Sequence, residues 1–390
     1  MFKPLESKTI MAVIYGTELF GSERGNLEAL RTLQELGAKI FVGVSGREDN
    51  GGAVGREARL LGFETFVIPF GSHFAYDWMR NDKTYRRNQF KRIFSNSLVL
   101  HKKISSIKPD QIIFSSVLPF IFCSLALAAN RTALIYRIGD APVIDSKFQM
   151  IFWKLLIRRS RKVVCISDFI REEVIRNSKI ASSKTCVIRN KPITRVEEPN
   201  HLLIQRLKNE KRMLQFVYVG QIDKKKGIDV LINALLKMDD EKIGCWIIGG
   251  SQHSTEFENK LRSAVNVATS RTFLKFLGYQ PDPRPYYEVA DWNFAPSVYN
   301  EPLGNVVQEA AAHCTPSIVS NRGGLPELIN PGVTGLILKN VSESDILQAI
   351  IQVQSMPTKW CEMGQNAYNL LASPNADKAF KEKWNLALQF

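Results

Sequence analysis

The sequence predicts an α/β protein made of two Rossmann-like, doubly wound domains. The chain has 390 residues, more than one hydrophobic core usually serves, so two domains of under about 200 residues each are expected. Short apolar runs rich in β-branched residues alternate with longer segments of helical period, which indicates a parallel sheet with helices on both faces. This alternation restarts after a polar stretch at 194–212, so a second sheet is expected to follow the first.

The expected elements can be given in chain order. The first half contains the strand candidates TIMAVIYG, AKIFVGVS, ETFVIPF, QIIFSS, ALIYRIG, KVVCIS and TCVIRN, with helices at about 25–36, near 55–61 and in DFIREEVIRN. The second half contains the strand candidates LQFVYVG, KIGCWIIGG, TFLKFLG, WNFAPS, PSIVS and GLIL, with helices in GIDVLINALLKM and from residue 304. We therefore expect a domain at 1–195, a linker at 196–212, a domain at 213–372, and a C-terminal helix at 373–390 that packs back on the first domain.

The strand-end loops are the expected place for chemistry. Ligands of open parallel sheets bind beyond the carboxyl ends of the strands, so two such domains facing each other place a site in the cleft between them. The sequence has no G-x-G-x-x-G spacing, which argues against a nicotinamide or flavin enzyme.

Composition excludes several other classes of protein. The hydrophobic fraction of 45% and the charged fraction of 23% are near globular averages, so the chain is not disordered, collagen-like or a coiled coil. The six cysteines are scattered without a C-x-x-C pair, which indicates free thiols in a reducing compartment. The five histidines form no cluster of metal-ligand spacing, and we expect no metal.

Two segments bear on localisation. The first apolar stretch, in MFKPLESKTIMAVIYG, is too short for a signal peptide, and we expect a cytoplasmic protein. The run IIFSSVLPFIFCSLALAA at 112–129 has no charge and is just long enough to span a bilayer. The favoured interpretation is a buried strand, a turn around Pro119 and an apolar helix, because Pro119 and a serine pair interrupt the run.

The stretch at 295–338 contains the most informative residues. Glu301 and Glu309 bracket a transition from loop to helix at Pro302, Leu303 and Gly304. A helix that begins there offers free N–H groups and a positive dipole end to an anion such as a diphosphate. Glu309 would lie about 7 Å along that helix, close to the distance from a diphosphate to its ribose.

Here the sequence resembles the family 4 retaining GT-B glycosyltransferases, also called glycosyl transferases group 1. Their signature of two glutamates separated by seven residues fits Glu301 to Glu309, and the resemblance extends through GGLPE at 323–327 and VYVGQIDKKKGIDVLINAL. It is close over 215–340 and general in the first half. It implies the GT-B fold and a nucleotide diphosphate sugar as donor substrate, with no cofactor. The alternative is a surface helix that follows a glycine-rich turn.

The resemblance also implies roles for individual residues. Lys226 occupies the position of a lysine that neutralises the diphosphate, whereas Gln221 replaces the usual arginine. Lys224 or Lys225 are candidates to compensate for that loss. The implied donor site consists of Gly21, Gln221, Lys226, Gly250, Gly278, Leu303, Gly304, Asn305 and Glu309.

The first half is expected to bind the acceptor. Its glycine-rich loop GTELFGSERG opens a helix and includes Gly21. Many relatives carry a histidine after the strand that corresponds to ALIYRIGDAP, and this chain has none there. Asp140 is our candidate for the base that activates the acceptor, with a loop or helix-cap aspartate as the alternative. The expected catalytic residues are Glu301, Lys226 and Asp140.

The formal charge of +14 is concentrated in the first half. Basic residues alternate with aromatic residues in two segments, which suits an anionic membrane surface or an acceptor carried on lipid phosphate, the alternative being a solvated face. No nucleic-acid recognition motif accompanies them. The segments contain Trp78, Arg80, Lys83, Tyr85, Arg86, Arg87, Phe90, Lys91, Arg92 and Phe94, and then Phe152, Trp153, Arg158, Arg159, Arg161 and Lys162.

The leading hypothesis is a glycosyltransferase that moves a sugar, with retention, to a lipid-linked, polysaccharide or lipopolysaccharide acceptor, either free in the cytoplasm or peripheral on the inner face of the membrane. One alternative is a GT-B epimerase or phosphorylase. The other is an inactive basic binding protein of the same fold, because Gln221 and the missing histidine depart from the family pattern.

Overall fold

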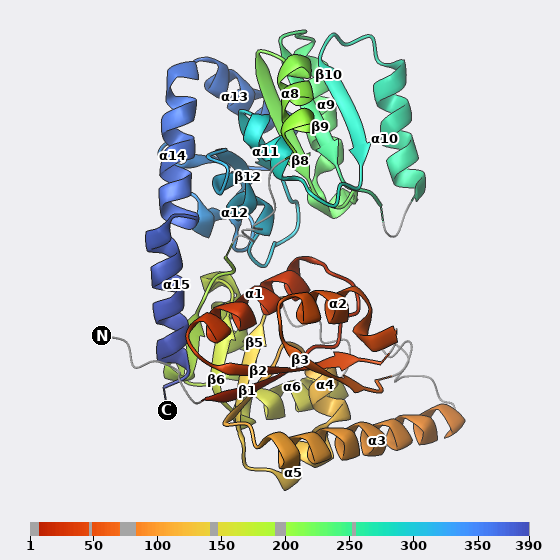
Figure 1. Cartoon of the computed structure of the whole chain (residues 1–390). Helices are drawn as coiled ribbons and strands as arrows, with labels where there is room; N and C mark the ends of the chain where they lie inside the picture. The colour runs from red at the N-terminus through yellow and green to blue at the C-terminus, as the bar shows by residue number, and fades with distance from the viewer. Residues whose placement is uncertain are drawn as a thin grey trace. The chain divides into compact units, whose positions relative to one another are not determined.

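The computed structural model describes residues 8–46, 49–70, 83–140, 147–191, 200–251 and 255–389, with the side chains of 83–90 and 147–148 outside the description. The chain forms two compact units. The N-terminal unit comprises 1–190 and 379–390, and the C-terminal unit comprises 191–378. Each unit is a parallel sheet with helices on both faces (Figure 1), so the prediction of two Rossmann-like α/β domains is confirmed.

The N-terminal sheet has, within the described residues, seven parallel strands in the order β3-β2-β1-β4-β5-β6-β7. Its strands are β1 (Thr9–Val13), β2 (Lys39–Ser45), β3 (Glu64–Ile68), β4 (Gln111–Phe114), β5 (Ala133–Ile138), β6 (Ser160–Cys165) and β7 (Thr185–Val187). The helices of this unit are α1 (Gly21–Glu35), α2 (Gly52–Leu60), α3 (Lys83–Ile107), α4 (Val117–Phe122), α5 (Ser124–Ala129), α6 (Lys147–Arg159) and α7 (Asp168–Ser178).

One core of this unit lies between its sheet and helices α1 and α2, with the end of the last helix, α15 (Pro374–Ala387), packed into it. Trp384 is fully buried there, and Lys381 pairs with Glu35 of α1. Helices α3 to α6 lie on the other side of the sheet from α1 and α2 (Figure 1). The two helical layers of this unit therefore present separate outer faces.

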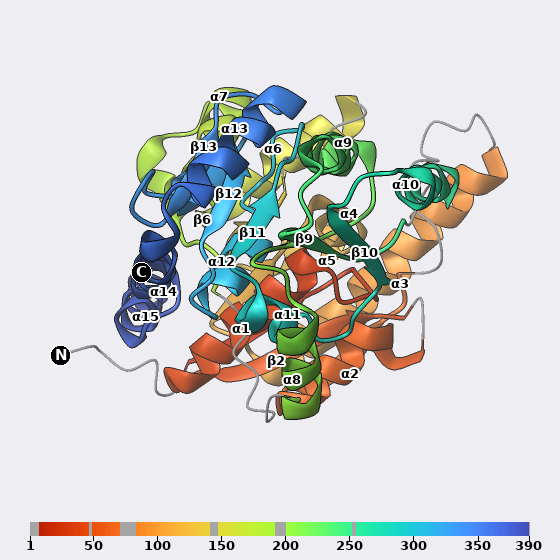
Figure 2. The ribbon, with the colours of Figure 1, turned by 90° about the horizontal axis from the view of Figure 1, so that it is seen from above.

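The C-terminal sheet has six parallel strands among the described residues, in the order β10-β9-β8-β11-β12-β13. Figure 2 shows the strands of this sheet from β13 at one edge to β10 at the other. The strands are β8 (Leu214–Val219), β9 (Ile243–Ile248), β10 (Phe273–Gly278), β11 (Trp292–Ala295), β12 (Ser317–Ser320) and β13 (Gly335–Leu338). The helices are α8 (His201–Glu210), α9 (Ile228–Met238), α10 (Thr255–Val267), α11 (Arg284–Val289), α12 (Asn305–Ala311), α13 (Glu343–Gln354) and α14 (Trp360–Leu371).

Several boundaries differ from those expected. Helix α1 begins at Gly21 and not near residue 25, because Gly25 is an interior helix residue whose missing side chain makes room for Asn190. Within the segment expected as a linker, 201–210 form helix α8, which is capped by Asn200 and buries Ile204 and Leu207. An amphipathic helix with a buried face belongs to a domain core and not to a free linker.

The apolar run at 112–129 is folded into the N-terminal unit. It forms the end of β4 and the short helices α4 and α5, and no helix among the described residues is long and apolar enough to cross a membrane. The expected turn at Pro119 lies instead at Ser115 and Ser116, because Pro119 is the third residue of α4, where a missing N–H costs no helical hydrogen bond.

Candidate active site

The strand order of the C-terminal sheet reverses between β8 and β11. These strands are neighbours in the sheet, although β9 and β10 separate them in the chain. At such a switch point the loops after the two strands diverge and leave a crevice at the carboxyl ends. Lys226 follows β8 and Glu301 follows β11, so the topology brings these two predicted residues together.

Lys226 and Glu301 form a direct ion pair. The Lys226 Nζ lies 2.7 Å from Glu301 Oε1 and 3.0 Å from Oε2. Ser297 Oγ donates a hydrogen bond of 2.7 Å to Glu301 Oε2, and the Tyr299 hydroxyl lies 3.2 Å from the lysine Nζ. The lysine and glutamate side chains are 20% and 14% exposed, so the pair is held in place but still reaches solvent.

The two loops that carry this pair are locked together through backbone atoms. Val298 N donates to Lys225 O at 2.9 Å, and Asp223 caps the short turn of lysines by accepting from Lys225 N. Gly227 has a φ of +69°, and a Cβ there would lie 2.1 Å from Pro296 O. Only glycine allows this approach, which places Lys226 beside the β11 loop.

The GGLPE loop packs against the backbone of Glu301 from the side of β12. Gly324 N donates to Glu301 O at 2.7 Å. Gly323 has a φ of +57°, and a Cβ there would lie 2.1 Å from the same oxygen. The residue before it, Arg322, is exposed, and no group in the described part of the chain hydrogen-bonds or ion-pairs with its guanidinium. An unpaired cation therefore lies on the loop that supports Glu301.

Helix α12 begins directly after Gly304, and Glu309 is its fifth residue. The Tyr287 hydroxyl lies 3.3 Å from Glu309 Oε2. Tyr287 is fully buried, and burial first and the Glu309 carboxylate second raise its pKa well above the usual value. The phenol therefore stays protonated and can donate to Glu309. The helix has only seven residues, so its dipole is a minor contribution.

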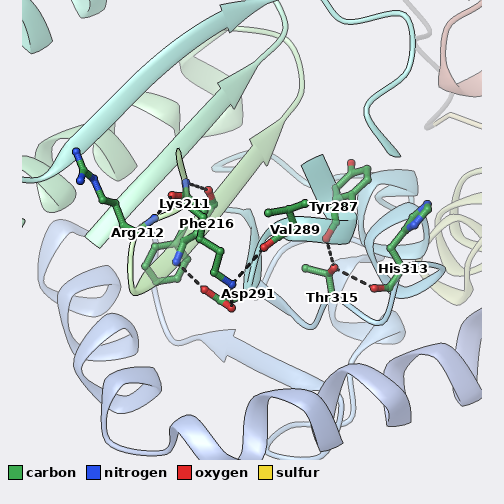
Figure 3. Close-up of polar contacts among 9 residues, drawn as sticks. Lys211, Arg212, Phe216, Tyr287, Val289, Asp291, His313 and Thr315 are labelled. Atoms are coloured by element: carbon green, nitrogen blue, oxygen red, sulfur yellow. Dashed lines mark hydrogen bonds and ion pairs between the residues drawn. The ribbon is translucent and has the colours of Figure 1, made fainter. Parts of the chain in front are cut away.

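Tyr287 is itself held from two sides. Its carbonyl accepts a hydrogen bond of 2.6 Å from Thr315 Oγ1, and its ring stacks on His313 with centroids 6.3 Å apart. Figure 3 shows Thr315 directed at this carbonyl. It also shows Lys211, which precedes β8, bonded to Val289 O and to Asp291, which precedes β11. Burial lowers the pKa of His313 and raises that of Asp291. The Glu309 carboxylate thus rests on an ordered support.

The remaining predicted donor residues lie at adjoining strand ends. Gly249 N donates to Gly278 O at 2.8 Å, and Ile222 N donates to Gly250 O at 3.1 Å. The Gln221 carbonyl accepts from the Tyr218 hydroxyl at 2.7 Å. The loops after β8 and β9, which contain Gln221 and Gly250, and Gly278 at the end of β10 are therefore neighbours at one edge of the sheet.

Leu303 and Asn305 flank Gly304 at the start of α12. The Leu303 side chain is buried, so a ligand would meet only its backbone. Asn305 is partly buried at the first position of the helix. Both residues belong to the same end of the C-terminal sheet as Lys226 and Glu301.

Gly21 and Asp140 lie together in the N-terminal unit. Gly21 is the first residue of α1, and the exposed Asp140 follows β5. A Cβ placed on Gly139 would be 4.0 Å from Ser22 Cβ, so the loop after β5 lies beside the first turn of α1. Glu23 in that turn accepts a hydrogen bond of 2.6 Å from Ser22 Oγ. Burial, and to a smaller extent Asp140, raises the pKa of Glu23.

Sequence reasoning missed several residues. The sequence around Glu23 is typical of a solvated helix face, and Ser297, Tyr287 and Arg322 belong to no recognised motif.

Arg137 is buried in β5, where it donates hydrogen bonds to Asn26 and Asn190, and burial lowers its pKa to about 10. The cavity beside it measures about 10 Å³, room for one water and not for a sugar.

Comparison with known proteins gives consistent matches for both halves. Residues 201–370 match the family model described as glycosyl transferases group 1, and residues 21–190 match the model described as glycosyltransferase family 4. A D-inositol 3-phosphate glycosyltransferase of Corynebacterium aurimucosum is 31% identical over 38% of this chain and 37% of its own. A lipopolysaccharide core biosynthesis glycosyltransferase of Rhizobium meliloti is 28% identical over 37% of this chain and 42% of its own.

These alignments span about a third to a half of the relatives' length. Solved structures match nearly the whole chain. A glycosyltransferase from Rickettsia africae superposes with a TM-score of 0.80 at 18% identity, covering 98% of this chain and 99% of its own. Anabaena HepE in complex with UDP superposes with a TM-score of 0.79 at 16% identity, over the same shares of the two chains. At such identities the likeness shows the fold.

Proposed function

Because the two family models together describe both of its halves, the chain belongs to the GT-B glycosyltransferases of the family 4 type, and we propose that it transfers a sugar from a nucleotide diphosphate sugar to an acceptor hydroxyl with retention. The observation that carries the proposal is the Lys226–Glu301 pair at the switch point of the C-terminal sheet. UDP and UDP-glucose in the titles of structures with this fold support a nucleotide-sugar donor.

In the proposed donor complex the diphosphate lies near Lys226 and the backbone at Gly304. The Glu309 carboxylate accepts hydrogen bonds from the ribose hydroxyls. The Tyr287 hydroxyl donates a hydrogen bond to one oxygen of Glu309 and so fixes the orientation of the other oxygen. Electrostatic support of the leaving diphosphate is then the main catalytic contribution. Glu301 contacts the transferred sugar, and its interaction strengthens as positive charge develops on that sugar in the transition state.

The proposal must also account for the charge that Gln221 does not supply. Lys226 is already paired with Glu301, so the Glu301 carboxylate offsets part of the positive charge that Lys226 offers to the diphosphate. Arg322 is exposed and unpaired within the described part of the chain, and its loop contacts the Glu301 backbone. We assign to Arg322 the neutralisation of one diphosphate oxygen, in the place of the arginine missing at 221. Guanidinium groups suit this role because they bind phosphate oxygens in a fork.

For the acceptor we propose a hydroxyl of a lipid-linked glycan, a polysaccharide or a lipopolysaccharide. Asp140 lies in the loop after β5 and Glu23 in the adjoining first turn of α1, and either carboxylate could accept the proton. Asp140 is the proposed base, and burial raises the pKa of the neighbouring Glu23. The relative named as a lipopolysaccharide core biosynthesis glycosyltransferase supports this class of acceptor, whereas the name of the D-inositol 3-phosphate glycosyltransferase refers to a small polyol phosphate.

The test is calorimetry with UDP, ADP and GDP, followed by turnover assays of the corresponding nucleotide sugars with and without lipid-linked acceptors. Transfer that requires an acceptor supports the proposal. Release of free sugar or phosphate-dependent cleavage without an acceptor would indicate an epimerase or phosphorylase. Binding of no nucleotide would indicate the inactive basic protein and contradict the proposal.

A further inference from the structure

The helices α3 to α6 of the N-terminal unit contain no acidic residue. Across 83–107, 117–129 and 147–159 the sequence has no Asp or Glu, whereas α3 alone has seven Lys and Arg and α6 has four. The helices on the other side of the sheet have mixed charge: α1 contains Glu23, Glu28 and Glu35, and α2 contains Glu57. The positive charge of the chain is therefore concentrated on one helical layer of this unit.

The same layer exposes large apolar side chains. Phe94 and Leu98 of α3, Leu125 of α5, and Ile151 and Leu155 of α6 are between 44% and 64% exposed. Each pair on α3 and α6 is four residues apart, so it forms a stripe along one side of its helix. The opposite sides of these helices are buried through Leu100, Ile104, Trp153 and Leu156. The stripes therefore face away from the sheet.

The helices are joined into one surface. Helix α3 contacts α4 and α5, and α4 contacts α6. Arg159 of α6 donates to Asn130 O at 3.1 Å, and the Asn130 amide lies 3.1 Å from His101 of α3. Exposed basic residues lie on the same two helices as the apolar stripes, with Lys91 and Lys102 on α3 and Arg158 on α6. We call this surface of α3, α5 and α6 the basic–apolar face.

We infer that the basic–apolar face docks the protein onto an anionic lipid membrane. Lysine and arginine are attracted to anionic headgroups, and exposed phenylalanine, leucine and isoleucine enter the headgroup boundary, where water is lost from their surface. The absence of acidic residues from these four helices fits a surface of one charge sign. The inference rests in part on the proposed function, because a membrane surface is where a lipid-linked acceptor would be met.

The expected region extends beyond these residues. Trp78 and Arg80, which the sequence places in the same basic and aromatic segment, lie outside the described residues, as do the side chains of Lys83, Tyr85, Arg86, Arg87 and Phe90. The next helix, α7, contains Asp168, Glu172 and Glu173, so the absence of acidic residues is limited to the helices α3 to α6.

The experiment is co-sedimentation of the full chain with vesicles of phosphatidylcholine, with and without phosphatidylglycerol. We expect binding only to the anionic vesicles. The triple variant Lys91→Glu, Lys102→Glu, Arg158→Glu should lose about a hundredfold in vesicle partition, since each basic residue near an anionic surface contributes about fivefold. The variant Ile151→Ser, Leu155→Ser should lose about tenfold, because two side chains no longer gain from leaving water.

The matched control is Lys208→Glu, Lys242→Glu, Lys359→Glu, which changes the net charge equally at exposed sites of the C-terminal unit. It should retain most of the binding. An equal loss in the control, equal binding to neutral vesicles, or binding to RNA without binding to vesicles would overturn the inference. Nucleotide calorimetry on each variant keeps the two proposals separate, because vesicle binding is measured without donor or acceptor.

Discussion

At the residue scale, the site depends on side chains whose roles differ although their chemistry is the same. Glu301 precedes helix α12 and is bonded to Lys226 and Ser297. Glu309 lies within that helix and accepts a hydrogen bond from the Tyr287 hydroxyl. A carboxylate that bonds ribose equally in the ground and transition states contributes to binding, and one that meets developing charge contributes to the rate.

We therefore expect the two glutamates to give different kinetic defects. Glu309→Ala should raise the donor KM about tenfold with kcat little changed. Glu301→Gln should lower kcat about a hundredfold or more while the nucleotide diphosphate binds at least as tightly as before, because Lys226 loses its competing carboxylate. Steady-state kinetics and calorimetry measure both, with the exposed Glu288→Ala as control. Normal turnover of Glu301→Gln would refute the assignment.

Arg322 gives a second prediction at this scale. A charge-assisted hydrogen bond to phosphate contributes roughly tenfold in affinity, so Arg322→Ala should raise the donor KM and the nucleotide diphosphate Kd by about that factor. Adding Gln221→Arg to this variant should restore part of the affinity, because arginine then returns to the loop after β8. The exposed Arg206→Ala serves as control. Unchanged nucleotide affinity in Arg322→Ala would show that Arg322 does not supply the positive charge that Gln221 lacks.

At the scale of elements, the donor site is built by loops that neighbouring strands bring together. The loops after β8, β11 and β12 meet at Lys226, Glu301 and Gly324, and close backbone contacts hold them. Helix α12 depends in turn on α11, since Tyr287 of α11 supports Glu309 and stacks on His313. The chain between α12 and β12 is therefore part of the support of the site.

The partly buried His313 makes this support sensitive to pH. Burial lowers the pKa of His313 in the folded state below the ordinary value of 6.5, so the unfolded chain binds more protons than the folded chain between these two pKa values. Stability from this group is full above pH 6.5 and decreases as the pH falls toward the folded pKa. We expect the fall in Tm between pH 7.5 and about pH 5.5 to be smaller in His313→Asn than in the parent protein. Equal falls, measured by calorimetry, would show that His313 does not contribute.

At the scale of the whole molecule, the chain uses two α/β units of the same kind for different expected tasks. The C-terminal unit holds the proposed donor residues other than Gly21, and the N-terminal unit holds Gly21, the proposed acceptor carboxylates and the basic–apolar face. The last helix returns to the N-terminal unit, where Trp384 is buried. Each unit thus has its own core and its own surface chemistry.

The whole enzyme is predicted to work without a divalent metal, because lysine, arginine and backbone N–H groups are available to the diphosphate and the sequence lacks a D-x-D motif between a strand and a loop. Turnover should be unchanged in excess chelator. Loss of activity on chelation that magnesium or manganese restores would contradict this prediction. A parallel assay after removal of the chelator by dialysis controls for irreversible unfolding.

The sequence by itself determined the fold class and the central motif of this protein. Alternation of apolar runs with helical periods predicts two parallel sheets, because the pattern is local and needs no knowledge of contacts. The spacing of Glu301 and Glu309 is also local, since one lies before a helix and the other about one turn inside it. These features depend only on neighbours in the chain.

Only the tertiary structure decided which residues support that motif. Ser297, in the loop after β11, and Tyr287 of α11 hydrogen-bond to the two glutamates, and Gly324 of the loop after β12 bonds to the Glu301 backbone. The order of strands in the sheet brings these segments together. The same holds for the basic–apolar face, where stripes on α3 and α6 form one surface because α4 and α5 join these helices. Such contacts join residues far apart in the chain, and their pairing energy depends on packing that no local pattern records.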